Sequence, residues 1–312
     1  MHGRLSVSYW KPLGAFGLLV LAGLIAWGPD RIWPVLMLRA FAIPMGFAFA
    51  AGAGLLLWRK QWLLMAGAVI VSVAAWYISD LPGRIPTHFG NGSTVLKLVQ
   101  MNVLQTNTDQ TGAIHAALAQ DPDVICFQEV DQEWVDRLLQ DLPAQYPYHC
   151  LAPRHDLYGM ALFSRLPFNE DTVRMLGPMP AILVRIQSGG LPVRLIAARL
   201  RAPETAADVR QRNVQWRQLA LWSLEDSCAT AVFGDLNTVP WDDAFQAYTS
   251  TTGMTSITSM PCPTWPAFSG HAIVPLDHFL LSHTLVPGRF SSFTIPGSDH
   301  LGIHVGIGIV IR

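Results

Sequence analysis

The chain has 312 residues, of which 51% are hydrophobic and 14% are charged. Soluble proteins usually carry roughly 25% charged residues. Residues 1–93 hold seven basic and two acidic side chains, a balance of +5, and the remainder stands at −6 because the whole chain sums to −1. The acidic remainder lacks the basic footprint of proteins that bind nucleic-acid duplexes tightly and without sequence preference. Composition therefore indicates an apolar, mildly basic N-terminal third joined to an ordinary globular part.

Three uncharged segments follow one another in the N-terminal third, at residues 12–28, 40–58 and 61–79. Each approaches the ~20 residues that a helix needs to cross a bilayer, and tryptophans lie near their ends. The first segment alone is compatible with a signal peptide, and all three are compatible with a buried helical core. Their succession and charged borders favour membrane spans, and the lack of charge inside them argues against a transporter. We predict a membrane anchor of three transmembrane helices over residues 1–80.

The basic residues at the borders of these segments predict their orientation. Arg4 and Lys11 precede the first segment, and Arg59 and Lys60 lie between the second and the third. Because positively charged loops stay in the cytoplasm, the N-terminus is expected inside the cell. Three crossings then place the globular part outside the cytoplasm.

Residues 81–93 hold two prolines and three glycines and are expected to form a linker before one globular domain at residues 94–312. Hydrophobic periodicity predicts mostly strands in this domain, with a few helices between them. In chain order the expected strands are 95–103, 123–130, 158–165, 181–187, 193–200, 231–233, 275–282 and 300–311, and the expected helices lie at 114–118, around Trp134 and at 204–226. This order favours an α/β fold in which sheets pack face to face and helices lie outside.

The stretch TAVFGDLNTVPWDD, residues 230–243, carries a chemical signal. An apolar strand stops at Gly234 and is followed by Asp235 and Asn237. Strand alternation puts these two side chains on one face, so that both can point at one target. An ordinary loop is the alternative, because Asp, Asn, Gly and Pro are also the residues that form turns.

Other expected strands also end in polar residues. The full set is Asn102, Glu129, Asp235, Asn237, Asp277, Asp299 and His300. Carboxylates and amides are hard oxygen ligands, which suit Mg²⁺ or Mn²⁺ rather than zinc. The four cysteines have no paired spacing and do not suggest a zinc site. Asp277 and His300 are candidates for a carboxylate–imidazole pair, which fixes the histidine tautomer and stabilises the imidazolium.

Six motifs in order resemble a known family: LVQMN, DPDVICFQEV, GMALFSRLP, GDLNTVPW, PLDHFLLS and GSDHLG. Together they closely resemble the endonuclease/exonuclease/phosphatase superfamily over about residues 94–312, and the whole chain resembles bacterial members that carry this domain behind membrane helices. The resemblance implies a four-layer α/β sandwich with two central, mainly antiparallel sheets. It also implies a Mg²⁺- or Mn²⁺-dependent phosphoric ester hydrolase in the bacterial inner membrane, and the predicted orientation makes its catalytic domain periplasmic.

The resemblance implies a metal site built from three of the polar residues. Glu129, of the QE motif, resembles the principal Mg²⁺ ligand, and Asn102 lies beside it in the family pattern. Asp299, of the SDH motif, resembles a second acidic group on the metal side.

The resemblance also assigns catalytic roles to four residues. Asp235 resembles the group that orients or deprotonates the attacking water, and Asn237 resembles a donor to the scissile phosphate. His300 resembles the residue that stabilises charge on the phosphate in the transition state, held by Asp277 of the LDH motif.

One position departs from the family pattern. Many members carry histidine in a THL-like element after the middle strand, whereas this chain reads AARLRAP and has Arg199 there. Arginine can clamp a phosphate with two hydrogen bonds but cannot donate a proton at neutral pH. Alternatively, Arg199 faces solvent or pairs with Glu204.

We therefore expect a membrane-anchored phosphodiesterase or phosphatase that acts on a phosphoester outside the cytoplasm. The alternatives are a membrane-tethered phosphate- or lipid-binding protein without turnover, which Arg199 supports, and a membrane scaffold. The motifs do not separate nucleic acid, phospholipid head groups and small phosphoesters, although Trp241, Trp265 and Phe268 in expected loops favour an envelope phosphodiester beside the bilayer. No protein partner is implied, and the pairing of the cysteines stays open.

Overall fold

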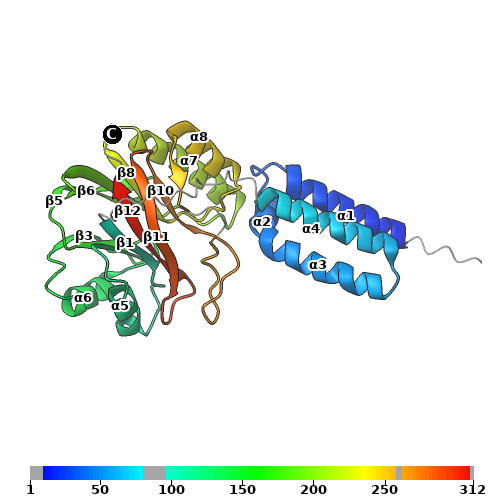
Figure 1. Ribbon diagram of the computed structural model, residues 1–312, viewed down its shortest axis with the longest axis horizontal. Helices are drawn as coiled ribbons and strands as arrows, with labels where there is room; N and C mark the ends of the chain where they lie inside the picture. Colours follow the sequence, from blue (N-terminus) through cyan, green and yellow to red (C-terminus); the bar gives the residue numbers. More distant parts are fainter. Residues whose placement is uncertain (1–9, 80–95, 258–261, 310–312) are drawn as a thin grey trace, which may run out of the picture. The chain divides into compact units, whose positions relative to one another are not determined.

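The computed structural model describes residues 10–79, 96–257 and 262–309. The chain splits into two compact units, Met1–Pro82 and Gly83–Arg312, and each is described by itself (Figure 1). The expected linker at residues 81–93 lies outside the described residues.

The first unit is helical. Its helices are α1 (Trp10–Trp27), α2 (Trp33–Ala40), α3 (Ala42–Trp58) and α4 (Trp62–Ser79). By length and composition α1 and α4 can each cross a membrane, and α2 with α3 forms a pair bent by 68° that adds a third crossing if it is one span. Two or three spans are therefore available, in agreement with the predicted anchor.

The helix α2 was not expected, because residues 30–39 were interpreted as a charged break between two spans. Pro34 lies in its first turn, where proline suits a helix, and Val35 and Leu36 are buried. Arg39 donates to the Gly28 carbonyl at 2.7 Å and also to the Asp30 carboxylate. Two of the three charges in this break are thus paired within the unit.

The second unit contains two six-stranded sheets. The strand order of the first is β11 (Leu285–Thr294), β12 (Leu301–Ile309), β1 (Leu96–Asn102), β2 (Val124–Gln128), β4 (Met160–Ser164) and β3 (Tyr148–Ala152). The order of the second is β5 (Phe168–Leu176), β6 (Met179–Ser188), β7 (Leu191–Ala198), β8 (Ala229–Asp235), β10 (Asp277–Leu281) and β9 (Thr255–Ser256). Only β1–β2 and β7–β8 pair in parallel, so both sheets are mainly antiparallel over the described strands.

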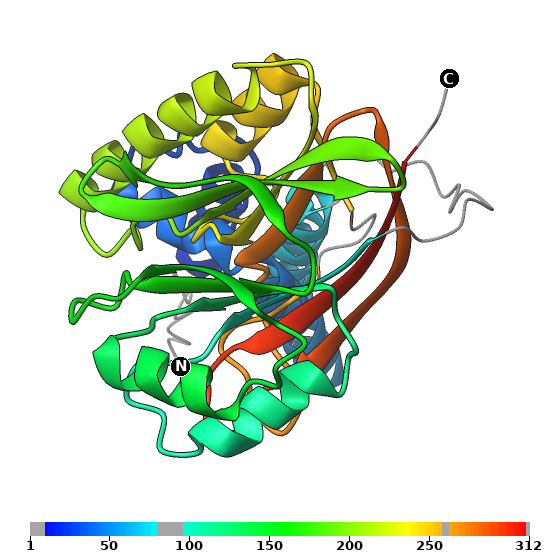
Figure 2. The same cartoon turned by 90° about the vertical axis from the view of Figure 1, so that its left-hand side faces the viewer.

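Helices cover the outer face of each sheet, as Figure 2 shows. The helices α5 (Gln110–Leu118) and α6 (Gln132–Asp141) pack on the first sheet, and α7 (Ala206–Ser223) and α8 (Asp243–Thr252) pack on the second. This order of helices, sheet, sheet and helices is the expected four-layer α/β sandwich.

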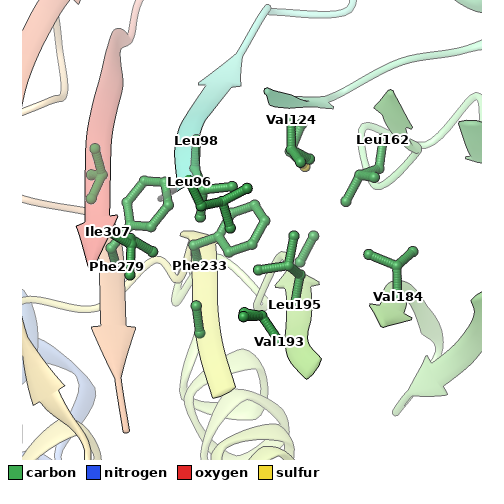
Figure 3. Packing of buried hydrophobic residues seen from close by; sticks show 14 of the residues in the cluster. Leu96, Leu98, Val124, Leu162, Val184, Val193, Leu195, Phe233, Phe279 and Ile307 are labelled. Carbon is green, nitrogen blue, oxygen red and sulfur yellow. The ribbon is translucent and has the colours of Figure 1, made fainter. Parts of the chain in front are cut away.

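Strand alternation explains how three separate apolar layers form. In β1, Leu96 and Leu98 enter the core between the sheets, whereas Val99 and Met101 enter the core under α5 and α6. Phe233 of β8 stacks on a neighbouring phenylalanine of β10 with ring centroids 4.9 Å apart, and Figure 3 shows these rings meeting the leucines of β1. Because both faces of the central strands are buried, their sequences read as nearly continuous apolar runs.

The strands that periodicity did not predict are mainly at the sheet edges. The strand β5 is the outermost strand of one sheet and β11 of the other, and both alternate poorly because most of their side chains are at least partly exposed. The predicted helix at 204–226 is α7, and Trp216 and Trp222 on it are buried as its apolar periodicity indicates.

Candidate active site

The side chains between the two sheets change from apolar to polar at one edge of the sandwich. In each central strand the polar residue continues the series that points into the inter-sheet core: Gln100 and Asn102 after Leu98, Gln128 after Cys126, Asp235 after Phe233, Arg199 after Ala197, and Asp277 before Phe279. All of these polar residues are buried. The fold therefore converts one face of several strands into a single polar cluster.

Two glutamines join the sheets beneath this cluster. Gln128 Oε1 accepts from Gln100 Nε2 at 2.9 Å and from the Asp235 backbone N–H at 2.8 Å, and Gln128 Nε2 donates to the Ala198 carbonyl at 2.9 Å. Gln100 Nε2 also donates to Asp277 Oδ1 at 2.9 Å. The sequence analysis assigned these glutamines no role. Their positions in the sequence could have indicated a role. Gln100 lies two residues before Asn102 and therefore on the same face of its strand, and Gln128 directly precedes Glu129.

Gly234 is required where β8 delivers its carboxylate. Its φ is +140°, which side-chain-bearing residues rarely adopt. A Cβ at this position would overlap the Ala198 carbonyl oxygen and lie 2.5 Å from Gln128 Nε2. The glycine thus lets β7, β8 and the glutamine support approach closely, and Asp235 follows directly.

Asn102 lies at the centre of the cluster. Its Nδ2 donates to Glu129 Oε1 at 2.8 Å and to Asp235 Oδ2 at 3.2 Å, and it lies 3.3 Å from His300 Nε2. Ser298 Oγ donates to the backbone carbonyl of Asn102 at 2.7 Å and accepts from the His300 N–H at 3.0 Å. These bonds fix the loop before β12 against the end of β1.

Glu129 is turned toward the cluster by a left-handed backbone with φ of +65°. Its N–H donates to the Gly159 carbonyl at 2.9 Å, which holds this conformation at the end of β2. Backbone strain of this kind is common at functional sites, because the surrounding structure has to enforce it.

Asp277 and His300 form a buried carboxylate–imidazole pair. His300 Nδ1 and Asp277 Oδ2 are 2.8 Å apart. Burial by itself opposes the charged imidazole, but the adjacent Asp277 carboxylate outweighs it and raises the pKa of His300 to about 9. Burial likewise opposes ionisation of Asp277, yet the imidazolium keeps the pKa of Asp277 below its ordinary value. The pair is therefore charged at neutral pH.

Asp235 is electrostatically different from Asp277, its direct neighbour across β8 and β10. Burial, together with the negative charge of Asp277, raises the pKa of Asp235 to about 6, although His300 and Arg199 act in the opposite direction. A carboxylate with its pKa near the working pH suits proton transfer.

Arg199 is inside the cluster. Its Nη2 lies 2.7 Å from Glu129 Oε1 and its Nε lies 3.4 Å from Asp235 Oδ2. Its Nη1 donates to the Leu157 carbonyl, and its guanidinium carbon lies 5.1 Å from the centre of the Tyr158 ring. The alternative expectation of a solvent-facing or Glu204-paired arginine is therefore wrong. Although burial works against its charge, Asp235 and Glu129 raise the pKa of Arg199 above its ordinary value.

Two predicted residues point elsewhere. Asn237 donates its backbone N–H to Asp235 Oδ1 at 3.1 Å, but its side-chain amide donates to the Leu200 carbonyl at 3.0 Å. Asp299 is half-buried, and its Oδ2 accepts from Trp265 Nε1 at 2.9 Å. The remaining six predicted residues come together: Asn102, Glu129, Arg199, Asp235, Asp277 and His300.

Side chains in the expected loops also differ from one another. Phe268 is 70% exposed, whereas Trp241 is 2% exposed, so only the former of these two can meet a lipid head group at the surface. The four cysteines are free, and Cys126 and Cys150 are buried within their strands. No disulfide has to be considered at the site.

The chemistry of the cluster fits a hard cation in donor type. The carboxylate of Glu129 and the amide of Asn102 are oxygen donors of the kind that Mg²⁺ prefers. Across the described parts of the chain, no group of three or more His, Cys, Asp or Glu residues is arranged to hold a metal ion. Glu129 has Arg199 as its counter-charge.

Comparison with solved structures places the sandwich among known folds. The chain is similar to D. rerio TDP2 complexed with single strand DNA product (15% identity, 69% of this chain and 100% of that one, TM-score 0.56). It is also similar to an endonuclease/exonuclease/phosphatase family protein from Bacteroides thetaiotaomicron (14% identity, 70% and 96%, TM-score 0.57). A third similar structure is the mannosyl-6-phosphatase of Bacteroides thetaiotaomicron (14% identity, 68% and 99%, TM-score 0.54). At these identities the likeness concerns the fold.

Comparison of the sequence with family models shows the family to which the chain belongs. No protein with a curated function matches the chain significantly in sequence. A family model described as "Endonuclease/Exonuclease/phosphatase family" matches residues 99–300, which include all seven strand-end residues and Arg199 and make up more than half of the chain. The match ends at His300, so it spans the cluster from β1 to the Asp277–His300 pair. The chain belongs to the endonuclease/exonuclease/phosphatase family.

Proposed function

We propose that the protein is a membrane-anchored phosphodiesterase or phosphatase that depends on a divalent metal ion. The family consists of phosphoester hydrolases, and its members generally use such an ion. The observation that carries the proposal is the buried cluster in which Asp235, with a pKa raised to about 6, lies beside the charged Asp277–His300 pair. Such an arrangement separates a proton acceptor from a fixed cationic donor within one small site.

Each group has a distinct task in this proposal. Asp235, ionised above about pH 6, accepts the proton of the attacking water. His300 remains protonated because Asp277 holds its Nδ1, so its Nε2 donates toward the negative charge that develops on the phosphate. Arg199 supplies a second fixed positive charge whose planar fork matches a phosphate. Because arginine cannot give up its proton, leaving-group protonation falls to another group or to water.

Glu129 and Asn102 would hold the metal ion, with Asp299 completing the acidic side as the family pattern implies. When bound, a divalent ion stabilises charge on the phosphate and on the leaving oxygen. Asn102 already orients the Glu129 carboxylate through the 2.8 Å hydrogen bond between them.

The substrate is proposed to be a phosphodiester of the cell envelope. The family fold itself serves different substrates, since D. rerio TDP2 is known with a single strand DNA product and a Bacteroides neighbour is a mannosyl-6-phosphatase. Two or three helices can span a membrane, and the basic residues Arg59 and Lys60 support an orientation that leaves the hydrolase outside the cytoplasm of a bacterial cell. The balance of −6 beyond residue 93 disfavours tight, non-specific duplex binding.

A second candidate function is supported by one specific observation. Arg199 neutralises Glu129, the carboxylate that the family pattern gives to the metal. A phosphate- or lipid-binding protein without turnover would need only the cationic groups Arg199 and His300. The two functions differ in whether phosphoester bonds are broken.

A hydrolysis assay on the full-length protein in detergent separates the two functions. The substrates are bis-p-nitrophenyl phosphate and p-nitrophenyl phosphate, with Mg²⁺, with Mn²⁺ and with chelator. We expect metal-dependent hydrolysis that Glu129→Gln reduces by at least roughly a hundredfold, the scale of a lost transition-state contact. Glu133→Gln, an exposed position on α6, is the matched control and should keep full activity. Full activity of Glu129→Gln, or hydrolysis that survives chelation, would contradict the proposal.

A further inference from the structure

We propose that Arg199 and a divalent ion exclude each other at Glu129, so that Arg199 holds this carboxylate in the metal-free protein and leaves it when the ion binds. The inference rests on the proposed function, because it takes Glu129 as the metal-binding carboxylate. Arg199 is then a positioning residue that sets the metal affinity of the site.

The hydrogen bonds of Glu129 show why both cations compete for its Oε1. Its Oε1 already accepts from Asn102 Nδ2 at 2.8 Å and faces Arg199 Nη2 at 2.7 Å. A carboxylate oxygen offers about two lone-pair directions, so these two donors occupy both. Its Oε2 receives the Gln105 N–H at 3.3 Å. A cation at Oε1 therefore needs the direction that Arg199 now occupies.

Burial makes this competition electrostatic as well as steric. The side chains of Arg199 and Glu129 are 8% and 6% exposed, so little water screens a charge placed between them. A divalent ion and a guanidinium on one carboxylate oxygen would repel each other strongly in such surroundings. The departure of Arg199 from Glu129 removes this repulsion.

Other groups can hold the Arg199 guanidinium after it leaves Glu129. Its Nε faces Asp235 at 3.4 Å but has no hydrogen-bond partner among the described residues, so one donor is already unused. Asp235 on one side and the Tyr158 ring on the other can retain the charge. Leu157, whose carbonyl accepts from Arg199, is itself 44% exposed and has a φ of +67°, which places this contact at the rim of the site.

The exchange has a consequence for substrate binding. Once off Glu129, the Arg199 fork is free to make two parallel hydrogen bonds to a phosphate oxygen pair. The same movement that admits the metal ion therefore prepares the phosphate site, which couples the two binding events. A histidine at this position, as many family members have, could not form an equivalent two-pronged contact with a phosphate.

Metal binding without turnover tests the exchange directly. The full-length protein in detergent is titrated with Mn²⁺, and free Mn²⁺ is measured by electron paramagnetic resonance. Arg199→Gln should bind Mn²⁺ roughly ten- to a hundredfold more tightly than the parent, the factor that corresponds to one charge-assisted hydrogen bond. Arg201→Gln is the matched control, because Arg201 carries the same charge near Tyr158 but pairs with Asp208 at 2.8 Å. It should leave the affinity unchanged.

A second measurement observes the exchange in the unmodified protein and uses the variant only to assign a signal. In the unmodified protein, the side-chain N–H signals of arginine are followed by NMR while Mg²⁺ is added. The Arg199 signal, identified by its loss in Arg199→Gln, should shift on Mg²⁺ binding, whereas that of Arg201 should stay in place. An Arg199 signal that does not respond to saturating Mg²⁺ would overturn the exchange.

A third variant separates failure of the exchange from failure of the proposed function. If Glu129→Gln abolishes Mn²⁺ binding but the parent and Arg199→Gln bind it equally, the exchange is wrong and the metal site stands. If Glu129→Gln binds Mn²⁺ as tightly as the parent, Glu129 is not the metal ligand, and the proposed metal site fails together with the exchange.

Discussion

Asp277→Asn removes the negative charge that keeps His300 protonated, while leaving the size of the side chain unchanged. Asp277 uses one oxygen for Gln100 Nε2 and the other for His300 Nδ1. Asparagine has only one oxygen and cannot accept both bonds. Burial, which opposes the imidazolium, remains in the variant. The pKa of His300 should therefore fall well below about 9.

The magnitude follows from the two pKa values of His300. The gap between 6.5 in the unfolded chain and about 9 in the folded chain corresponds to about 3 kcal/mol of stabilisation. Because the folded value is the higher one, this contribution is fully present below pH 6.5 and is lost as the pH rises through about 9. Asp277→Asn should therefore destabilise the protein more near pH 6 than near pH 10.

The assay is an NMR titration of histidine-labelled full-length protein, paired with thermal unfolding at several pH values. The exposed His115 on α5 provides an internal reference signal. In the parent, the His300 signal should titrate near pH 9. A parent His300 that titrates near 6.5, or an equal loss of stability in the variant at pH 6 and pH 10, would refute the assignment of a charged pair.

Three further predictions concern the backbone, the base and the membrane anchor. Gly234→Ala should lower the unfolding temperature and the activity, because a strained φ alone costs about 1–3 kcal/mol and the Cβ also meets Ala198. Gly253→Ala, where φ is +67° and the space around the glycine is open, should lower the unfolding temperature less. Equal melting temperatures for the two variants would count against this account. Asp235→Asn should lower kcat roughly 10²- to 10⁴-fold, the usual contribution of a general base, and a kcat within tenfold of the parent would exclude that role. A reporter that is active only outside the cytoplasm should be active when fused after residue 312 and silent after Lys60, and the reverse pattern would place the hydrolase in the cytoplasm.

Sequence patterns predicted the central strands well and the edge strands poorly. The apolar runs of β1, β2 and β8 were recognisable because both faces of these strands are buried. The strands β5 and β11 at the sheet edges carry mixed side chains, since one side of each has no neighbouring strand to pack against. The helix α2 was missed because its charged Arg39 was interpreted as part of a break, whereas Asp30 and Gly28 lie within reach and satisfy the buried guanidinium.

The sequence alone indicated most of the polar residues that the fold brings to one edge of the two sheets. Alternation along each strand specifies the face of a side chain, so Asn102, Asp235 and Asp277 could be assigned to a common site before any packing was known. The abrupt end of an apolar run indicated where these residues lie along the strand. A carboxylate that follows a buried strand is tolerated only where other groups satisfy it.

Only the tertiary structure decided which of these residues touch. Arg199 could be expected to face a phosphate, solvent or Glu204, and it pairs with Glu129 because β7 and β2, in different sheets, end at the same edge of the sandwich. Asp299 and Asn237 carry suitable groups, yet Trp265 and the Leu200 carbonyl bind their side chains. Local periodicity sets the direction of a side chain relative to its own strand. Its contact partner depends on how the two sheets pack, and this packing is determined by residues that lie far apart in the chain.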